Sequence, residues 1–229
     1  MNLHEGHRQR LKTRFLNQGL SGFEDHNILE LLLFFALPRN DTNELGHLLL
    51  QNFGSLSNVF DASYEELCKV KGIGENSATL IKLIPELLSV YHCDKTENLK
   101  IVNSTNEAGR YFVPRFMGKN IEEVHIMLLD DKKKVIRSEK VSEGVVNASA
   151  ISVRKIVAIA VNSNATGIIL AHNHPGGVAL PSSSDQRTTN KLYHALKLMD
   201  IQLCDHIIVA DGDFVSMADS GMFEAFKYE

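Results

Sequence analysis

The stretch that most constrains the fold of this chain is an apolar run that ends in a pair of histidines. Residues 166–171 (Thr-Gly-Ile-Ile-Leu-Ala) are mostly apolar and rich in β-forming types, so they predict a buried strand. His172 and His174 follow, and side chains two residues apart on a strand point to the same face. A proline and two glycines then end the strand, and residues 182–185 predict the start of a helix. Both imidazoles should therefore point at one spot, to which the next helix can bring a carboxylate.

Those histidines and Asp185 make up a ligand set that is typical of metal centres. Two neutral imidazoles, one carboxylate and a water molecule form the ligands of an open, catalytic zinc site. We therefore predict that His172, His174 and Asp185 bind one Zn²⁺ per chain. The alternative is structural, because Ser182 and Asp185 are spaced as in a capping box at a helix N-terminus. The two interpretations are compatible, since a helix start can also hold a metal ligand.

The composition is that of an ordinary globular protein. The chain has 229 residues, 44% of them hydrophobic and 23% charged, which allows a sizeable core in one large domain or two small ones. The formal net charge is −4, which argues against a general polyanion-binding protein. Residues 1–90 carry 8 Lys and Arg against 11 Asp and Glu, a net charge of −3. Any contact with nucleic acid must therefore be local.

The cysteines and the apolar runs predict a location. Cys68, Cys93 and Cys204 are scattered and include no Cys-x-x-Cys pair, which is typical of a reducing compartment and offers no thiolate zinc site. The N-terminal residues are too polar for a signal peptide. The most apolar run, residues 28–37, is too short to span a membrane and contains Glu30. We therefore expect a cytoplasmic protein without a membrane partner.

Residues 1–92 are expected to form an all-helical domain. The apolar run at 28–37 predicts a core helix that ends before Pro38. Asp41 and Thr42 then predict the start of another helix, and the Phe-Gly pair at 53–54 predicts its end.

A Gly-Ile-Gly turn between two predicted helices is the second motif of the chain. The surrounding segment resembles a helix-hairpin-helix module, in which the turn exposes backbone N–H groups that can bind a DNA phosphate. Lys69, Lys71, Gly72 and Gly74 are therefore candidates for a weak DNA contact. The alternative is a purely structural helical hairpin, in which Ile73 anchors the core.

Beyond a polar segment at 93–106 the periodicity changes. That segment predicts a linker with a short strand near 99–102. Strands are then expected at 124–129, 135–141, 166–172, 203–210 and 214–217, and helices at 107–112, 149–161 and 186–199. Strand pairs interleaved with helices indicate a three-layer or α+β domain over residues 107–229.

The whole chain resembles a known family. The spacing His-x-His-x7-Ser-x-x-Asp at 172–185 matches the motif of JAMM (JAB/MPN+) metalloproteases, which cleave peptide or isopeptide bonds. Resemblance to the RadC family rests on Gly19-Leu-x-Gly-Phe, Glu30-Leu-Leu-Leu-Phe, Phe53-Gly-Ser-Leu, Lys71-Gly-Ile-Gly, His172-Asn-His-Pro and Asp205-His-Ile-Ile. It implies a helical domain with a helix-hairpin-helix (1–92), a linker (93–106) and a JAMM-like, cytidine-deaminase-like domain with a mixed sheet flanked by helices (107–229). The family name implies a link to DNA repair.

The JAMM resemblance also implies a glutamate from an early strand as general acid and base. The family-like position is Glu122, and its neighbour Glu123 is a rival. Adjacent residues on a strand point to opposite faces, so only one of the two can face the site. Glu143, beside Gly144, is a third candidate.

Three functions stand as hypotheses. The leading one is a zinc-dependent hydrolase acting on a peptide or protein substrate. In it Glu122 takes a proton from the metal-bound water, and Ser182 donates a hydrogen bond to the tetrahedral oxyanion. The second is a DNA-binding accessory protein whose JAMM domain is only a scaffold. The third is a metal-dependent nuclease, for which the sequence offers no carboxylate-rich two-metal site.

Overall fold

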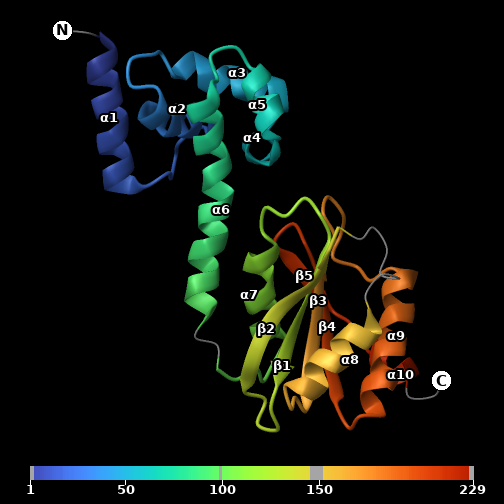
Figure 1. Cartoon of the computed structure of the whole chain (residues 1–229). Coiled ribbons are helices and arrows are strands. Elements are labelled where there is room, and N and C mark those ends of the chain that lie inside the picture. Colours follow the sequence, from blue (N-terminus) through green and yellow to red (C-terminus); the bar gives the residue numbers. More distant parts are fainter. Residues whose placement is uncertain (1–2, 98–99, 145–151, 227–229) are drawn as a thin grey trace. The chain divides into compact units, whose positions relative to one another are not determined.

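The computed structural model of the chain describes residues 3–97, 100–144 and 152–226. The chain divides into two units, Met1–Leu87 and Leu88–Glu229 (Figure 1). The first has a core made by helices, and the second has cores on both faces of a sheet. The candidate metal ligands all belong to the second unit.

Short helices build the first unit: α1 (Leu3–Gln18), α2 (Asp25–Ala36), α3 (Asn43–Phe53), α4 (Leu56–Asp61), α5 (Tyr64–Lys69) and the start of α6 (Glu75–Glu97). The sequence signals for α2 and α3 are confirmed, because α2 ends before Pro38 and α3 lies between Thr42 and Gly54. Fully buried aliphatic side chains from several of these helices form the core, among them Leu29, Leu33, Leu49, Leu67 and Ile81.

The predicted hairpin is the pair α5 and α6. Ser63 and Glu66 form a capping box that begins α5. Gly72 in the turn has a φ of +94°, and a Cβ there would lie 2.7 Å from a methyl group of Leu45. The positive φ favours glycine, since other residues rarely adopt it, and any side chain there would also have to displace Leu45. Ile73 is buried in the core, as expected.

Helix α6 extends into the segment at 93–106 that the sequence predicts as a linker. The helix continues to Glu97, because no glycine follows it and the only proline, Pro85, lies well inside. Ile101 then forms an isolated bridge with Lys134. Residues 98–99, at the start of the short strand predicted there, lie outside the described residues. Separate folding of 1–92 and 107–229 remains a prediction.

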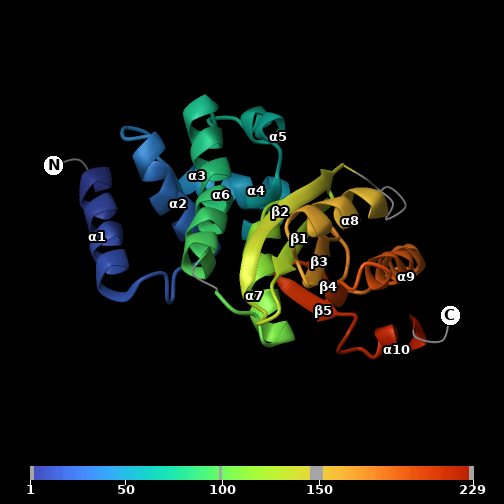
Figure 2. The same cartoon turned by 60° about the horizontal axis from the view of Figure 1, so that its bottom comes forward.

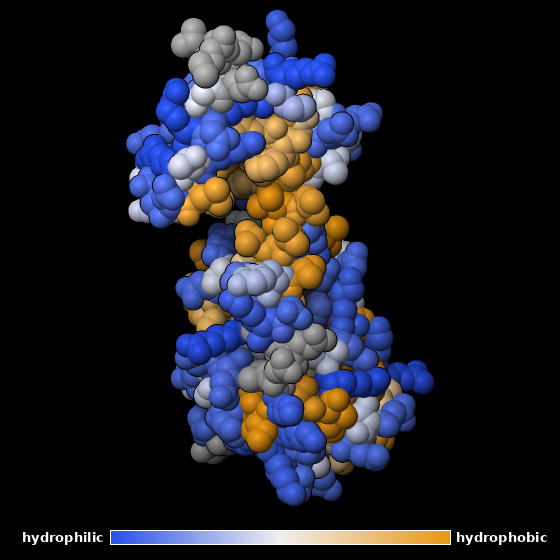
Figure 3. All heavy atoms as spheres, turned by 90° about the vertical axis from the view of Figure 1, so that its left-hand side faces the viewer, coloured by the Kyte–Doolittle hydropathy of each residue, from blue (hydrophilic) through white to orange (hydrophobic). Residues whose placement is uncertain are grey.

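Exposed apolar side chains are concentrated on the middle of α6. They are Leu83, Leu87, Leu88, Val90 and Tyr91, and Figure 3 shows apolar residues in orange along this helix. Earlier in α6, Ala78 and Ile81 enter the core of the first unit. Ser89, in the part of α6 that belongs to the second unit, donates its hydroxyl proton to the carbonyl oxygen of Pro114 (2.8 Å).

A five-stranded mixed sheet forms the second unit, in the order β2-β1-β3-β4-β5. Its strands are β1 (Glu123–Leu129), β2 (Val135–Glu143), β3 (Gly167–Asn173), β4 (Gln202–Ala210) and β5 (Asp213–Ser216). Strands β3 and β4 pair in parallel, and the other neighbours are antiparallel. The parallel pair is joined through helix α9, as a crossover requires.

Helices cover both faces of this sheet, so the unit has three layers (Figures 1 and 2). Helix α7 (Thr105–Phe116) packs on one face, against Met127, Ile169 and Ile207 among others. Helices α8 (Val153–Asn162) and α9 (Ser183–Lys197) pack on the other, against side chains such as Ile126, Ile168 and Leu170. The short α10 (Met222–Phe226) follows β5. The expected mixed sheet flanked by helices is confirmed.

The element boundaries differ from expectation at a few places. Helix α7 is longer than the predicted 107–112, because Ser104 caps its start and Pro114 interrupts the hydrogen-bond ladder only in the last turn. The predicted helix at 149–161 corresponds to α8, and residues 149–151 lie outside the described residues. The predicted turn at Asp211 and Gly212 is confirmed by φ angles of +48° and +80°.

Candidate metal centre

Strand β3 brings the two histidines together. It is the central strand, buried along its whole length, and it pairs with β1 on one side and β4 on the other. His172 and His174 point to the face of the sheet that α8 and α9 cover. Val124 of β1, which pairs with His172 of β3, lies on the same face. Their ring Nε2 atoms lie 2.9 Å apart.

Asp185 reaches the same point from the start of α9. Ser182 is the N-cap, and its hydroxyl accepts a hydrogen bond from the Asp185 N–H (3.2 Å). The Asp185 carboxylate accepts one in return from the Ser182 N–H (2.7 Å). This capping box turns the carboxylate toward the histidines, at 3.2 Å from His172 Nε2 and 3.5 Å from His174 Nε2. The structural and the ligating interpretations of Asp185 therefore hold together.

The hydrogen bonds of the rings suit a cation. His174 Nδ1 lies 3.1 Å from the carbonyl oxygen of Val178, which can only accept, so Nδ1 carries the proton and the neutral ring keeps a lone pair on Nε2. The three groups offer one ligand atom each within 4.8 Å of one another, and they form the one such His, Cys, Asp and Glu group within the described residues. The residues present thus fit a metal ion.

A buried chain of hydrogen bonds orients His172 from behind. His172 Nδ1 lies 2.8 Å from Nε2 of His206, and His206 Nδ1 lies 2.6 Å from the hydroxyl of Thr189, which also donates to the carbonyl of Asp185 (2.6 Å). Because Thr189 donates its hydroxyl proton to the carbonyl of Asp185, its oxygen must accept from His206 Nδ1. His206 Nε2 is then unprotonated and accepts a hydrogen bond from His172 Nδ1. This direction leaves His172 Nε2 free to bind a metal.

Sequence reasoning missed His206 and Thr189. Burial lowers the pKa of His206 well below its ordinary value, so the ring stays neutral, as the chain requires. The available signal was a polar Asp205-His206 pair inside the otherwise apolar β4. The two side chains face opposite ways, because His206 is level with Leu170 and Asp205 with Ile169.

Electrostatics favours an ionised carboxylate at the centre. Burial alone would raise the pKa of Asp185, but the hydrogen bonds to His172 and His174 outweigh it and hold that pKa far below its ordinary value. Hydrogen bonding to Asp185 raises the pKa of His174, against the effect of burial, and the charge of Glu122 adds to the rise.

The three candidate glutamates separate by strand parity. Glu122 directly precedes β1 and shares the face of Val124, and its charge acts on His174. Glu123 is buried on the opposite face, where it accepts hydrogen bonds from His125 and Lys140 (3.0 and 3.3 Å). Glu143 pairs with Glu123 across the strands and forms an ion pair with Lys140. The structure brings only Glu122, of these three, to the face of the metal ligands.

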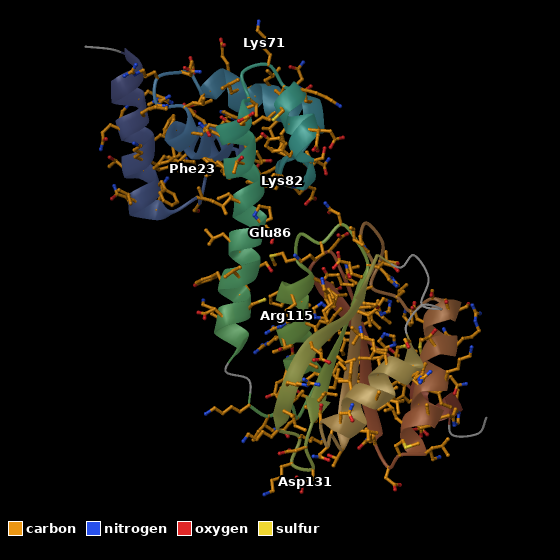
Figure 4. The ribbon with its side chains drawn as sticks, viewed as in Figure 1. Phe23, Lys71, Lys82, Glu86, Arg115 and Asp131 are labelled. Carbon is orange, nitrogen blue, oxygen red and sulfur yellow. The ribbon has the colours of Figure 1, made fainter. Side chains whose placement is uncertain are left out.

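The candidate DNA contacts lie in the first unit. Lys71 is exposed in the α5–α6 turn and points outward (Figure 4), and Lys69 is exposed at the end of α5. Gly72 and Gly74 precede the first turn of α6, which contains the acidic Glu75. Lys82 is used otherwise, since it donates to the carbonyl oxygens of Phe60 and Ala62 at the end of α4. The turn has the predicted shape, and its contact with DNA remains a prediction.

Cys68, Cys93 and Cys204 form no disulfide within the described residues. No helix within the described residues is long and apolar enough to cross a membrane.

Comparison with known proteins identifies the family. The model of the RadC-like JAB domain matches residues 102–222, and the model of the UPF0758 N-terminal domain matches residues 4–79. A UPF0758 protein of Fusobacterium nucleatum is 36% identical over 225 residues, 95% of this chain and 97% of its own length. UPF0758 proteins of Pseudoalteromonas translucida and Vibrio parahaemolyticus are 34% and 33% identical, over 93% and 92% of this chain and 96% and 94% of theirs. The chain therefore belongs to the RadC-like, UPF0758 family of proteins with a JAB domain.

Proposed function

We propose that this protein is a zinc-dependent hydrolase of the JAMM type that cleaves peptide or isopeptide bonds. One observation carries the proposal: the Nε2 atoms of two histidines and the carboxylate of Asp185 converge on one point. Strand alternation favours the same face for Glu122, which directly precedes β1. A purely structural site would not need two imidazole lone pairs directed at each other.

The chemistry divides between the ion and the chain. A zinc ion held by His172, His174 and Asp185 would supply a Lewis acid that makes a water molecule acidic near neutral pH. The carboxylate of Glu122 accepts the proton of that water and passes it to the nitrogen of the leaving amine. This role needs a carboxylate that lies close to the metal ligands without being one of them.

Other side chains hold this arrangement in place. Ser182 is exposed beside Asp185, where its hydroxyl can donate a hydrogen bond to the oxygen of the tetrahedral intermediate. His206 and Thr189 keep the proton of His172 on Nδ1 and away from the metal side of the ring.

Partners and location are part of the proposal. The substrate is a peptide or protein, and a weak DNA contact is made through the α5–α6 turn, where Lys71 is exposed. Cysteines without disulfides, scattered along the chain, support a reducing, cytoplasmic location. A nuclease is less well supported, because the described residues contain no second ligand group of the kind that a two-metal site needs.

The test begins with the metal and continues with substrates. Chain purified without chelators is expected to carry, or to take up, about one zinc by native mass spectrometry. It is then assayed on linear peptides, isopeptide-linked peptides and DNA, each with and without zinc. A chain that neither carries nor takes up zinc sinks the proposal, and cleavage of DNA alone favours the nuclease.

A further inference from the structure

Asn173, which lies between the two histidines, makes hydrogen bonds on the other side of β3. Its side chain is 3% exposed and points away from the metal ligands, by strand parity. Its Oδ1 accepts a hydrogen bond from the backbone N–H of Glu123 (2.7 Å), and its Nδ2 donates to the carbonyl oxygen of Ile121 (3.1 Å). The two bonded backbone groups stand on either side of Glu122.

The position of these bonds explains their use. Backbone pairing between β1 and β3 stops at Val124 and His172. Beyond that point the β3 backbone bonds to β4, since the N–H of His174 donates to the carbonyl oxygen of Val209 (2.8 Å). The chain before β1 would therefore lack a partner on this side. The carboxamide of Asn173 supplies one acceptor and one donor there, as a further pair of ladder bonds would.

The backbone of Glu122 is also hydrogen-bonded on the side of β2. Its carbonyl oxygen accepts a hydrogen bond from the N–H of Gly144, just past β2 (2.9 Å). With the peptide groups on both sides of Glu122 fixed by Asn173, the alternation of side chains continues past the end of β1. By this alternation Glu122 lies on the side of His172 and His174, and Glu123 faces His125.

We propose that Asn173 is a positioning residue for Glu122, and this rests on the proposed function of Glu122 as general acid and base. The carboxamide fixes the direction of the Glu122 side chain, whereas the metal ligands keep their own supports. His172 is held by the β-ladder and by His206, and Asp185 by the capping box. Loss of the carboxamide should therefore separate the proton carrier from the metal site and leave the site itself intact.

Three variants of the full chain test this. Asn173→Ala removes the donor and the acceptor, and Asn173→Asp keeps an acceptor for the Glu123 N–H but faces the Ile121 carbonyl with a second acceptor. Asn162→Ala, at the exposed end of α8, is the matched control. Amide exchange at Glu123, followed by NMR, should become at least about tenfold faster in Asn173→Ala and should stay slow in the other two.

The direction of Glu122 is read with Co²⁺ as the probe, in protein labelled at glutamate. The paramagnetic ion should displace the side-chain signals of Glu122 strongly in the wild type and the control, and much less in Asn173→Ala and Asn173→Asp. Affinity for Co²⁺ should agree within about threefold among all four proteins, since no ligand changes. Unchanged displacement at Glu122 in both Asn173 variants would overturn the inference.

A substrate, once found, adds a double-mutant cycle. Asn173→Ala should lower kcat in the wild type and change it little in a Glu122→Gln background, because a residue that acts through Glu122 has nothing to position there. Equal losses in both backgrounds contradict the inference. Failure of the wild type to bind Co²⁺ contradicts the proposed function instead. Amide exchange at Glu123 then still decides whether the Asn173 carboxamide holds the backbone beside Glu122.

Discussion

The two units each bury a carboxylate beside a histidine, and the partners of the two carboxylates differ. Glu30 in α2 and Asp185 in α9 are both only 2% exposed. Glu30 accepts hydrogen bonds from His7 Nε2 and Asn43 Nδ2, both at 2.8 Å, and one from Asn27 at 3.4 Å. These donors come from α1, α2 and α3, so the carboxylate joins three helices.

Asp185 has a different set of partners. Its one backbone donor is the N–H of Ser182, and two imidazole Nε2 atoms face it and each other. Neutral imidazoles with protonated Nδ1 offer lone pairs, whereas the amide groups around Glu30 offer protons. Burial is equal at the two sites, so the partners, mainly amide groups at Glu30 and a converging pair of imidazoles at Asp185, distinguish a structural carboxylate from a candidate metal ligand.

The largest expected effect concerns Glu122, the glutamate proposed as proton carrier at the candidate metal site. Glu122→Gln should retain zinc and lower kcat by roughly 10²–10⁴, the range for general acid–base catalysis. Glu123→Gln, one residue away on the opposite face, is the matched control and should change kcat little. Zinc content and turnover of both variants are measured side by side. A larger loss in Glu123→Gln would reverse the assignment.

The second prediction makes the same change at the two buried carboxylates. Asp185→Asn removes a negative ligand and should weaken zinc binding by more than the roughly 10–100-fold of an outer partner, with activity partly restored by excess metal. Asp131→Asn, in the exposed β1–β2 turn (Figure 4), should not.

Glu30→Gln should show the reverse pattern. The carboxylate of Glu30 accepts hydrogen bonds from His7 and Asn43, and a carboxamide would direct its N–H₂ group at one of these donors. The loss should lower the free energy of unfolding by about 1–3 kcal/mol. Zinc affinity should not change, because the metal ligands lie in the other unit. Zinc titration and denaturant unfolding of both variants check this. Loss of zinc in Glu30→Gln would break the comparison between the units.

The third prediction concerns the support behind His172. His206→Phe keeps an aromatic ring, slightly larger than imidazole, that cannot accept the proton of His172 Nδ1, so zinc affinity should fall about 10–100-fold. Competition with a chelator measures the affinity, and circular dichroism shows whether the fold is retained. Thr189→Val should have a smaller effect in the same direction, because Thr189 contacts His206 and the backbone carbonyl of Asp185 but no ligand atom.

Sequence patterns reached the site through short-range rules. Strand alternation placed His172 and His174 on one face, and the capping box placed Asp185 at the start of α9. Parity could say that Glu122 and Glu123 face opposite ways, but only the register of β1 against β3 shows which faces the ligands. Val178 lies in the turn just after His174, and its contact depends on how that turn folds.

The remaining differences have long-range causes. His206 touches His172 because β4 lies parallel to β3, a pairing between residues 34 positions apart. Asn173 bonds to residues about 50 positions away, at the start of β1 and just before it. The extent of α6 was missed because a polar composition at 93–97 does not itself end a helix. Contacts of this kind follow from topology and are not written in local patterns.

The fourth prediction is the pH dependence of zinc uptake. The pKa of His174 is raised in the metal-free protein, first by its hydrogen bond to Asp185, and a protonated imidazole cannot bind a metal. Apparent zinc affinity should therefore be highest above that pKa and should fall as the pH drops through it, by about tenfold per pH unit for one proton. Because the pKa of Asp185 is far below that of His174, zinc affinity should already fall at a pH where Asp185 is still ionised. Isothermal titration at several pH values gives the affinity. An affinity independent of pH between about 5 and 8 would contradict it.

The smallest expected effect lies in the first unit, where the exposed turn is the candidate ligand site. Glu30 is buried and hydrogen-bonded within the unit, whereas Lys69 and Lys71 are exposed and can contact DNA phosphates. With a net charge of −3 over residues 1–90, binding should be weak and should fall steeply with salt. The double variant Lys69→Ala/Lys71→Ala should bind several-fold more weakly on every sequence alike and should lower the salt slope by about 2, one for each phosphate contact. Lys132→Ala/Lys134→Ala, in the β1–β2 turn, is the control pair. Fluorescence anisotropy at several salt concentrations measures both. Unchanged affinity and slope in the first variant would mean that the α5–α6 turn, like Glu30, serves only the fold.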